Sequence, residues 1–413
     1  MVNLNIVTPT HNISFLRETY ESLLKQTDRK WKWLIVLNSG AKNPEIQDDR
    51  VIVVEAPTDI PRNNVGAIKN YAFNLVDDGI SLELDHDDLL TPNAVKLVKK
   101  AFEDDCVGIV YSDFADFIDE SWRPHRNSEK NGWLYRQEEF YGKKFDVCRA
   151  FKLTAQSISL VYFAPIHIRA WKTKLYKEVD GHNPNLIVAA DHELLCKLYL
   201  KAKFKYIPKC LYLHREHSKN TYKQNLDIMN DITYSIYDEY IDLLIDRWCS
   251  INNYKKLDIC CGNSPNKGYI GMDISQGDII SDLNCNFPLK DNSVAVVKAT
   301  DALEHLKDPV HTMNEIYRIL IHGGWLISDT PSTDGRGAFQ DPTHCSFWNY
   351  NSFLYYTNKM FSKYVPNIDC RFQSMRLYNY FPSEYHKKLN IPYIKSHLVA
   401  VKNGIRLPGE IKI

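Results

Sequence analysis

The segment SLELDHDDLLTP, residues 81–92, constrains this chain more than any other part of it. Its apolar beginning predicts a buried strand that runs directly into three carboxylates. Asp85 and Asp87 occupy alternate positions, so both side chains are expected to leave a strand on the same side. Neighbouring carboxylates repel one another unless a cation lies between them, and hard divalent cations take oxygen ligands of this kind. The segment therefore predicts a divalent-cation site at a strand end.

An ordinary acidic turn is the alternative interpretation of the same residues. Thr91 and Pro92 make a good start for a helix, and an acidic turn before a helix needs no ligand. An EF-hand calcium loop does not fit, because Leu89 and Leu90 stand where that pattern has polar residues or glycine. The rest of the N-terminal half decides between a cation site and a surface turn.

Strands and helices alternate through the N-terminal half. Strands are predicted at residues 4–8, 33–37 and 51–54, and helices at 15–25 and from about residue 63 onward. This alternation predicts a parallel α/β sheet. Ligands of such sheets bind beyond the carboxyl ends of the strands, where Thr8, Asn38 and Asp85 are expected to meet.

These segments resemble the inverting family 2 glycosyltransferases of the GT-A fold. The resemblance rests on VTPT at 7–10, SLLKQ at 22–26, the pair Lys69–Asn70 and DHDD at 85–88. It implies a nucleotide-sugar donor, with UDP as the expected nucleotide, and Mn²⁺ or Mg²⁺ on the donor diphosphate. The donor-binding residues that it implies are Thr8, Pro9, Thr10, Asn38, Lys69, Asp85 and Asp87. The chain departs from the family pattern at Asn38, where an aspartate usually faces the base.

Residues 188–198 (VAADHELLCKL) predict a helix with an acidic first turn. On its own, Asp191 fits an ordinary helix N-cap. By the same resemblance, Asp191 is the catalytic base that takes the proton of the acceptor hydroxyl, and Glu193 is the alternative. Carboxylates serve in this role because they stay ionised near neutral pH.

Two further segments carry candidate site residues. In LYLHREHS at 211–218, the resemblance implies His217 as a metal ligand beside the two aspartates, with His214 as the alternative. A lone histidine is equally compatible with a surface or capping role. In PIHIRAW at 165–171, the donors and the ring of Trp171 suit either an acceptor surface or core packing.

A long amphipathic helix is predicted between residues 222 and 248, because apolar residues recur there at helical spacing. A helix of this kind connects two neighbours and packs on them. A dimer seam is the alternative, although the heptad pattern is poor.

A second α/β unit follows this helix. Strands are predicted at 256–259, 269–273, 294–299 and 325–328, and a helix through 316–320 is expected to end at Gly323–Gly324. Gly262 permits a ligand to approach the backbone, and Asp273 suits the two hydroxyls of a ribose.

The order of these elements resembles the class I S-adenosylmethionine-dependent methyltransferases, in particular a compact group from polysaccharide biosynthesis. The resemblance implies that Leu303, Glu304 and His305 line the methyl-transfer site. The cofactor-binding residues that it implies are Asp258, Gly262, Asp273, Asp282, Leu283 and Asp301. The catalytic residues are His305 and His344, with His344 of the DPTH segment as general base for a sugar hydroxyl.

Two features of this second unit leave alternatives open. His344 is equally well explained as a turn residue held by Asp341. The pair Cys260–Cys261 replaces the more usual Gly-Cys, which keeps open a methyltransferase-like domain that no longer binds its cofactor. Residues beyond Phe361 are aromatic-rich and show no clear pattern.

Length and composition agree with two catalytic domains. A chain of 413 residues favours two or three domains. We expect two Rossmann-like α/β domains: a GT-A domain at 1–221, a connecting helix at 222–250 and a methyltransferase domain at 251–413.

Charge and cysteine usage exclude several classes of protein. Lys plus Arg and Asp plus Glu number 51 each, so no net field attracts nucleic acid or anionic membranes. Ten cysteines without a CxxC pair argue against zinc and suit a reducing cytoplasm. No signal peptide and no membrane-length apolar run is expected, so a cytoplasmic location is predicted.

The sequence therefore predicts a bifunctional enzyme that adds a sugar to a glycan or glycolipid acceptor and O-methylates the glycan. A homodimer is possible. One alternative is a glycosyltransferase with a decayed methyltransferase-like binding domain. Another is a phage-type enzyme that glycosylates a modified DNA base, against which the lack of a basic stripe counts.

Overall fold

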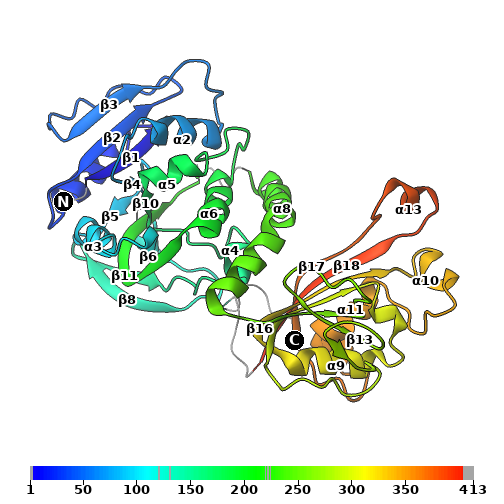
Figure 1. Ribbon diagram of the computed structural model, residues 1–413. Coiled ribbons are helices and arrows are strands. Elements are labelled where there is room, and N and C mark those ends of the chain that lie inside the picture. Colours follow the sequence, from blue (N-terminus) through cyan, green and yellow to red (C-terminus); the bar gives the residue numbers. More distant parts are fainter. Residues whose placement is uncertain are drawn as a thin grey trace. The chain divides into compact units, whose positions relative to one another are not determined.

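The computed structural model describes residues 3–402, apart from residues 120, 130, 131, 219, 221, 222 and 224. Its internal contacts divide the chain into two compact units, of which the first ends at Arg247 and the second begins at Trp248 (Figure 1). This boundary lies inside the long helix α8 (Leu226–Asn252). Each unit has a β-sheet of its own.

In the first unit, four parallel strands form one half of the sheet. β1 (Leu4–Thr10) lies between β2 (Lys32–Leu37) and β4 (Ile80–Glu83), and β3 (Val51–Glu55) pairs with the far side of β2 (Figure 1). β2 is apolar at every position after Lys32 and is buried there, as expected for a parallel strand covered on both faces, and all four residues of β4 are buried as well. The three strands β1, β2 and β4 therefore end at one edge of the sheet.

The other half of this sheet is mixed, so the expectation of an entirely parallel sheet is wrong beyond β4. β10 (Arg169–Lys172) is inserted antiparallel between β4 and β6 (Val107–Ile118), and β11 (Lys203–Glu216) pairs parallel with β6. Strand β10 was not predicted, because a strand of four residues has too few positions to show a period. The remaining strands are β5 (Leu89–Leu90), β7 (Arg123–His125), β8 (Tyr135–Phe140) and β9 (Lys143–Cys148).

Helices cover both faces of this sheet and have local reasons to begin where they do. The side chain of Asn64 caps α2 (Val65–Asn74) by accepting a hydrogen bond of 2.9 Å from the amide of Ala67. Helix α8 buries an apolar stripe that includes Ile236, Tyr237 and Leu244. The other helices are α1 (Leu16–Leu24), α3 (Ala94–Ala101), α4 (Ala155–Ile158), α5 (Thr173–Glu178) and α6 (Ala190–Lys201).

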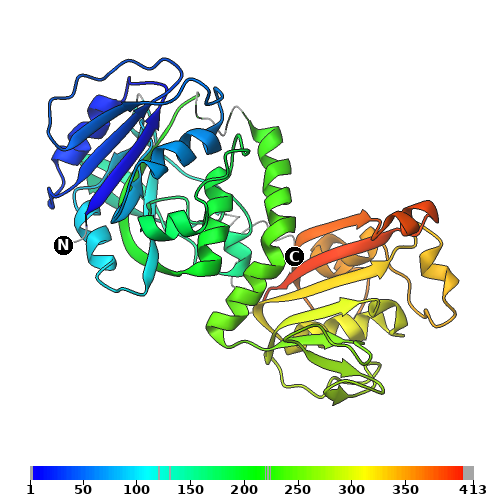
Figure 2. The ribbon, with the colours of Figure 1, turned by 45° about the horizontal axis from the view of Figure 1, so that its top comes forward.

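The second unit has seven strands among the described residues, in the order β14-β13-β12-β15-β16-β18-β17 (Figure 2). All pairs are parallel except those of β18, which is antiparallel to both neighbours. The strands are β12 (Lys256–Ile259), β13 (Ile270–Asp273), β14 (Ile279–Ile280), β15 (Val294–Thr300), β16 (Leu320–Pro331), β17 (Phe372–Tyr380) and β18 (Tyr393–Ala400). The helices are η2 (Leu303–His305), α9 (Pro309–Ile319), α10 (Gly337–Gln340), α11 (Tyr350–Thr357), α12 (Lys359–Ser362) and α13 (Glu384–Lys388).

Two expectations for this unit need correction. Helix α9 ends at Ile319 rather than at the glycine pair, since Leu320 is already extended and pairs with Val294. Gly323 therefore lies within β16 and not at a helix end. The region beyond Phe361, which showed no clear pattern, supplies β17 and β18, which pair with each other, and β18 also pairs with the more distant β16.

The connection between β12 and β13 is unusually short. Residues 260–269, all of them described, form turns without a helix. The carboxylate of Asp258 braces this loop by accepting hydrogen bonds of 2.8 and 2.7 Å from the amide and the side chain of Asn266. The chain can therefore turn back after β12 without a helix.

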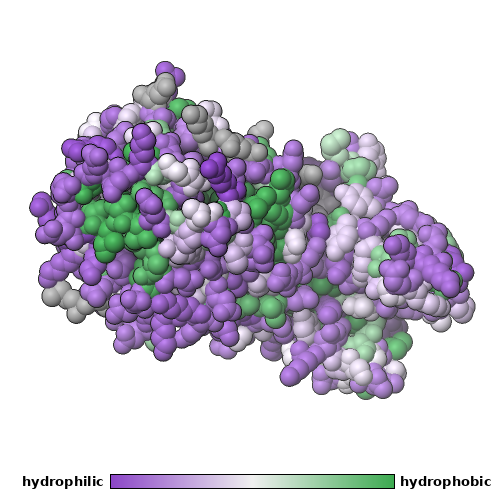
Figure 3. Space-filling model, turned by 90° about the horizontal axis from the view of Figure 1, so that it is seen from above, coloured by the Kyte–Doolittle hydropathy of each residue, from purple (hydrophilic) through white to green (hydrophobic). Residues whose placement is uncertain are grey.

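Among the residues that the structure describes, no helix is long and apolar enough to cross a membrane. The face in Figure 3 is mostly hydrophilic and carries several separate hydrophobic patches.

Candidate active sites

The first candidate site lies at the carboxyl ends of β1, β2 and β4. Thr10 and Asn38 meet there, since the amide of Asn38 donates a 2.9 Å hydrogen bond to the carbonyl of Thr10. The side-chain oxygen of Asn38 is buried and has no hydrogen-bond partner. A buried amide oxygen without a partner is costly, so Asn38 is suited to accept a hydrogen bond from a ligand.

Thr8 supports this edge from inside the sheet. Its hydroxyl donates to the carbonyl of Leu84 at 2.7 Å and accepts from the indole of Trp33 at 2.8 Å. The side chain is fully buried. Thr8 therefore fixes β1 against β2 and β4, and only its backbone is left for a ligand.

The acidic segment forms a turn rather than a continuation of the strand, because β4 already ends at Glu83. The strand alternation expected for the two aspartates therefore does not apply. Asp85 lies 3.6 Å from the ammonium of Lys69, and Asp87 lies 2.9 Å from Nε2 of His217. Burial alone would raise the pKa of Asp87, but the His217 hydrogen bond and the nearby histidines lower it to about 2. Asp87 is thus ionised at neutral pH.

Asp87 and His217 fit a divalent cation. Ligand atoms around one octahedral ion lie about 3 Å apart, given metal–ligand distances of about 2.1 Å. The 2.9 Å separation of Asp87 Oδ2 and His217 Nε2 matches that spacing. The carboxylate of Asp85 is partly exposed beside Lys69, and Asp85 does not join Asp87 and His217 in a compact cluster of possible ligands among the described residues.

Asp88 holds the acidic turn in place from below. It accepts hydrogen bonds of 2.7 Å from the hydroxyl of Tyr212 and from the amide of Arg215. The guanidinium of Arg215 donates to the carbonyl of Asp87 at 2.7 Å and is almost completely buried. His214, the alternative metal ligand, instead contacts Asp116 at 2.9 Å and has no contact with Asp87.

Four charged side chains form a chain that leads to the candidate base. Glu83 of β4 is buried between Lys69 of α2 and Arg169 of β10, whose guanidinium donates two hydrogen bonds of 2.9 Å to it. Arg169 donates a third, of 2.7 Å, to Asp191 of α6. Such forked arginine–carboxylate contacts fix position as well as charge.

Asp191 is the exposed end of this chain, with 28% of its side chain accessible. It does not cap its helix: the residue at the N-cap is Ala189, without a side-chain hydrogen bond. Burial raises the pKa of Asp191, but Arg169 and Lys69 outweigh it and lower the pKa to about 2. Glu193, the alternative base, is buried and accepts a 3.0 Å hydrogen bond from Tyr240 of α8.

Glu83 and Arg169 are site residues that the sequence did not single out. Glu83 lies in the segment 81–92, of which only the aspartates were singled out. Arg169 lies in the segment 165–171, which was described only by its hydrogen-bond donors and its aromatic ring. Trp171 of that segment is fully buried against Phe73 and Tyr176, so it packs in the core and does not form an acceptor surface.

The second candidate site lies at the carboxyl ends of β12 and β13. Gly262 has a positive φ of 56°, and a Cβ at this position would meet no atom within 4 Å. Asp273 accepts hydrogen bonds from the amides of Gly262 at 3.1 Å and Ser275 at 3.0 Å, which lower its pKa against the opposing effect of burial. The carboxylate keeps further lone pairs beside open backbone, which fits a ribose of S-adenosylmethionine.

The other residues expected to bind this cofactor occupy varied positions. Asp258 is buried and holds the loop through Asn266, and the side chain of Leu283 belongs to the hydrophobic core. Asp282 is exposed and accepts hydrogen bonds of 2.9 Å from Asn284. Asp301 is exposed at the end of β15 with a positive φ of 48°. Of these, only the two exposed aspartates present a side chain to the surface.

Glu304, His305 and His344 come together at the end of β15. Their possible ligand atoms all lie within 4.8 Å of one another, and the two imidazole rings meet edge to face at 5.0 Å. Glu304 is 2% exposed, and neither of its carboxylate oxygens has a hydrogen-bond partner. Burial, with smaller effects of Asp301 and Asp341, raises the pKa of Glu304 to about 8. His344 lies 4.0 Å from Asp341, which is too long for a direct hydrogen bond.

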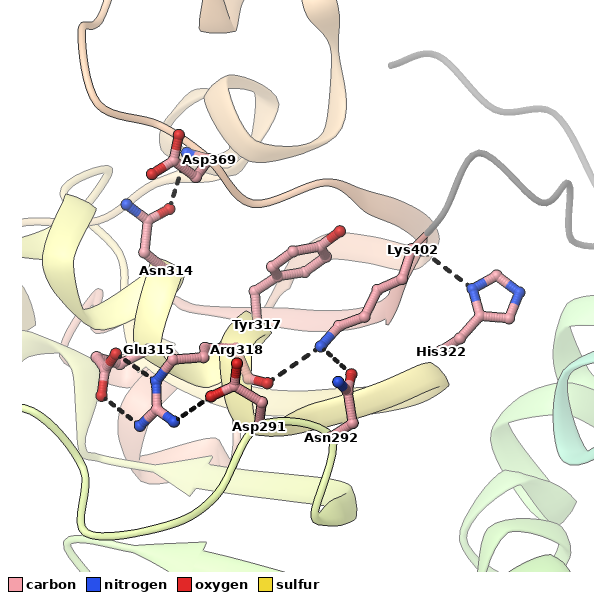
Figure 4. Close-up of a pocket in the computed structure, with 9 residues that line it drawn as sticks. All are labelled: Asp291, Asn292, Asn314, Glu315, Tyr317, Arg318, His322, Asp369 and Lys402. Atoms are coloured by element: carbon pink, nitrogen blue, oxygen red, sulfur yellow. Dashed lines mark hydrogen bonds and ion pairs between the residues drawn. The ribbon is translucent and has the colours of Figure 1, made fainter.

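A cavity of about 540 Å³ lies elsewhere in this unit. It is lined by residues of α9, by Asp291 and Asn292 before β15, by His322 of β16, and by Asp369 and Lys402 (Figure 4). Its polar groups are bonded to each other: Arg318 to Glu315 and Asp291, and Lys402 to Asn292. The residues Asp291 and Asn292 precede β15, whereas Glu304 and His305 follow its other end. The cavity is therefore separate from the second candidate site.

Comparison with protein families matches two separate parts of the chain. Residues 5–162 match the description Glycosyl transferase family 2, and residues 253–328 match a methyltransferase domain. The chain therefore contains a family 2 glycosyltransferase domain followed by a methyltransferase domain, as the sequence predicted.

Three curated proteins are similar to a little over half of the chain. Chondroitin synthase of Escherichia coli is 24% identical over 251 residues, which are 58% of this chain and 33% of that protein. Hyaluronan synthase of Pasteurella multocida is 26% identical over 268 residues, 58% of this chain and 24% of that protein. Chondroitin synthase of Pasteurella multocida (strain Pm70) is 26% identical over 238 residues, 54% of this chain and 22% of that protein. The chain thus spans a third or less of the length of these relatives.

Among solved structures, S. aureus TarS 1-349 is 15% identical and covers 61% of this chain and 73% of its own, with a TM-score of 0.40. The same protein in complex with UDP-GlcNAc is 13% identical, covers 60% of this chain and 74% of its own, and has a TM-score of 0.41.

Proposed function

We propose that this chain is a bifunctional enzyme that transfers a sugar from a nucleotide-sugar, with UDP as the nucleotide, to a glycan and then O-methylates that glycan. The observation that carries the first activity is the charged chain from Lys69 through Glu83 and Arg169 to Asp191. It places an ionised, partly exposed carboxylate on the same framework as the acidic turn, in a domain of the matching family. The names of the curated relatives support a polysaccharide acceptor.

In the proposed transfer, Asp191 accepts the hydrogen bond of the acceptor hydroxyl. The oxygen of that hydroxyl attacks the anomeric carbon, the bond to the nucleotide diphosphate breaks, and Asp191 takes the proton. A carboxylate with a pKa of about 2 is a weak base, so the proton is transferred as the new bond forms and not before. Arg169 keeps Asp191 ionised and in one orientation.

Asp85, Asp87 and His217 are the residues that would hold Mn²⁺ or Mg²⁺. A divalent ion in this place supplies positive charge to the leaving diphosphate. The buried side-chain oxygen of Asn38 would accept a hydrogen bond from the N–H of a uracil base.

For the second activity, Gly262 and Asp273 would hold S-adenosylmethionine, which supplies an electrophilic methyl group. Glu304, His305 and His344 lie at the end of the neighbouring strand and would receive the sugar hydroxyl. Phe339 and Phe347 stack on each other beside this cluster, and both are more than half exposed. Exposed aromatic rings of this kind suit the apolar face of a sugar.

We also propose the domain division 1–221, 222–250 and 251–413, with the long helix as connector.

A methylated sugar has one hydroxyl fewer for extension, so methylation would end the glycan chain.

Thermal unfolding in the presence of nucleotides, with and without Mn²⁺, tests the proposal. A ligand that binds only the folded protein at a hundredfold excess over its dissociation constant stabilises it by about 2.7 kcal/mol. We expect UDP with Mn²⁺ and, independently, S-adenosylmethionine to raise the unfolding temperature. Failure of every nucleotide contradicts the first activity. Failure of S-adenosylmethionine alone favours the alternative in which the second domain is a methyltransferase-like domain without catalysis.

A further inference from the structure

Three clusters of acidic and histidine side chains in the described residues are compact enough to hold a metal ion. Two of them share His214 and lie in the first unit. Their groups already bind each other or the backbone: Asp88 accepts from Tyr212 and Arg215, and His214 contacts Asp116. These two clusters are therefore satisfied without an ion.

The third cluster, Glu304, His305 and His344, differs in this respect. Both carboxylate oxygens of Glu304 are buried and have no hydrogen-bond partner. Such a group requires a partner that supplies positive charge or a proton donor. Asp301 and Asp341 also lie close enough to act electrostatically on Glu304, so the surroundings of the cluster are negative.

The two histidines are oriented as metal ligands usually are. Nδ1 of His344 lies 3.0 Å from the carbonyl of Ala338, and Nδ1 of His305 lies 3.3 Å from the carbonyl of Thr343. A carbonyl only accepts, so each Nδ1 carries the proton and each Nε2 keeps a free lone pair. Metal-binding histidines typically donate their second ring nitrogen to a carbonyl or carboxylate in this way.

The backbone holds the cluster together. The carbonyl of Glu304 accepts hydrogen bonds of 2.9 and 3.0 Å from the amides of Cys345 and Ser346. The hydroxyl of Ser346 donates to the carbonyl of Leu303 at 2.8 Å. The segment that carries His344 is thus fixed to η2, which carries the other two residues.

We propose that Glu304, His305 and His344 bind a divalent transition-metal ion. Two imidazoles and one carboxylate suit Mn²⁺, Fe²⁺, Co²⁺ or Zn²⁺. Ligand atoms around such an ion lie about 3 to 3.5 Å apart, so small side-chain rotations from the present separations complete the site. His305 and His344 are then ligands and do not act as free general bases.

The consequence for methyl transfer rests on the proposed function, whereas metal binding itself does not. A cation here lowers the pKa of a sugar hydroxyl bound next to it. The oxygen would take the methyl group from the sulfonium sulfur of S-adenosylmethionine, which leaves as the thioether, and the hydroxyl proton would pass to solvent.

Titration with Co²⁺ tests the metal site directly, since imidazole ligands give Co²⁺ visible absorption bands. The full chain carrying Asp87→Asn is used, which removes the proposed cation site of the first unit. We expect one equivalent of Co²⁺ to bind, and binding to weaken at least tenfold in His305→Ala and in Glu304→Gln. His386→Ala, a histidine of α13 outside the cluster, is the matched control and should bind as before.

S-adenosylmethionine binding, measured by calorimetry on the same proteins, shows whether each variant is folded. Glu304→Gln is isosteric, so it keeps the packing even if His305→Ala does not. Absence of Co²⁺ binding in the chain with Asp87→Asn alone overturns the proposal, as does binding that none of the cluster substitutions weakens. In the chain with Asp87→Asn alone, Co²⁺ binding without any S-adenosylmethionine binding would instead contradict the proposed function and leave the metal site standing.

Discussion

At the scale of single residues, Asp87 is the group on which donor binding depends. Asp87→Asn keeps the shape of the side chain but removes the charge that faces His217. We expect this variant to lose Mn²⁺-dependent binding of the nucleotide-sugar and to lose sugar transfer, because the charge of the leaving diphosphate is no longer balanced. Calorimetry with UDP and Mn²⁺ measures the first loss. S-adenosylmethionine binding should be unchanged, and full transfer activity in excess chelator would show that no metal is needed.

Asp191 offers a second residue-scale prediction. Asp191→Asn preserves the contact with Arg169 in part but cannot take a proton. Turnover should fall by ~10² or more, the usual cost of losing a general base, while donor binding survives. Steady-state kinetics separates the two effects. Glu193→Gln serves as the matched control, since Glu193 is directed to Tyr240; a larger loss in that variant would move the base to Glu193.

At the scale of elements, the pairing of β6 with β11 contains a buried ion pair. His214 of β11 lies 2.9 Å from Asp116 of β6. Burial lowers the pKa of His214. The carboxylates of Asp88 and Asp116 raise it by more than burial lowers it, so that the pKa is about 10. A pKa raised on folding stabilises the folded state fully below the unfolded value near 6.5. That contribution is lost as the pH rises through the folded value.

His214→Gln tests this pairing. The variant should be less stable than the unsubstituted chain at pH 6.5, and the difference should shrink as the pH rises toward 9, by up to about 1.4 kcal/mol per pH unit. Hydrogen exchange of the β6 and β11 amides gives the free energy of opening at each pH. A difference that stays constant across this range would mean that His214 is neutral in the folded protein.

At the scale of the whole molecule, the two units are expected to act on one glycan in sequence. Asp273→Ala removes the carboxylate proposed to bind the cofactor ribose, and a methyl group cannot replace its hydrogen bonds. This variant should still make the glycosylated product, but without the methyl group. Mass spectrometry of the products distinguishes the two outcomes, and the Asp87→Asn variant, which should yield neither the glycosylated nor the methylated product, is the control.

The order of the two reactions follows from the polar groups of the second site. An acceptor without the new sugar would leave these groups unpaired, so methylation should depend on prior glycosylation. Equal methylation of the unglycosylated acceptor would refute this order. Methylation of no glycan at all, with the cofactor bound, would assign the second domain another substrate.

The sequence by itself determined the features that depend on neighbours along the chain. Short apolar runs gave β1, β2, β4 and β12, because their periodicity and their bounding polar residues are local. The same holds for the helix that carries Asp191. The segment Asp85–Asp88 was instead expected to continue the strand, and the structure shows a turn there. The two family resemblances rest on such local motifs and were confirmed by the comparisons.

Only the tertiary structure decided which groups meet. Arg169 gained its role from β10, a four-residue strand whose insertion between β4 and β6 depends on pairing with distant partners. Gly323 looked like a helix end, but Leu320 pairs with Val294 and makes it part of a strand. Glu304 is one carboxylate among 51 acidic residues in the sequence. Its lack of a partner is a property of what surrounds it in space, and no pattern along the chain encodes it.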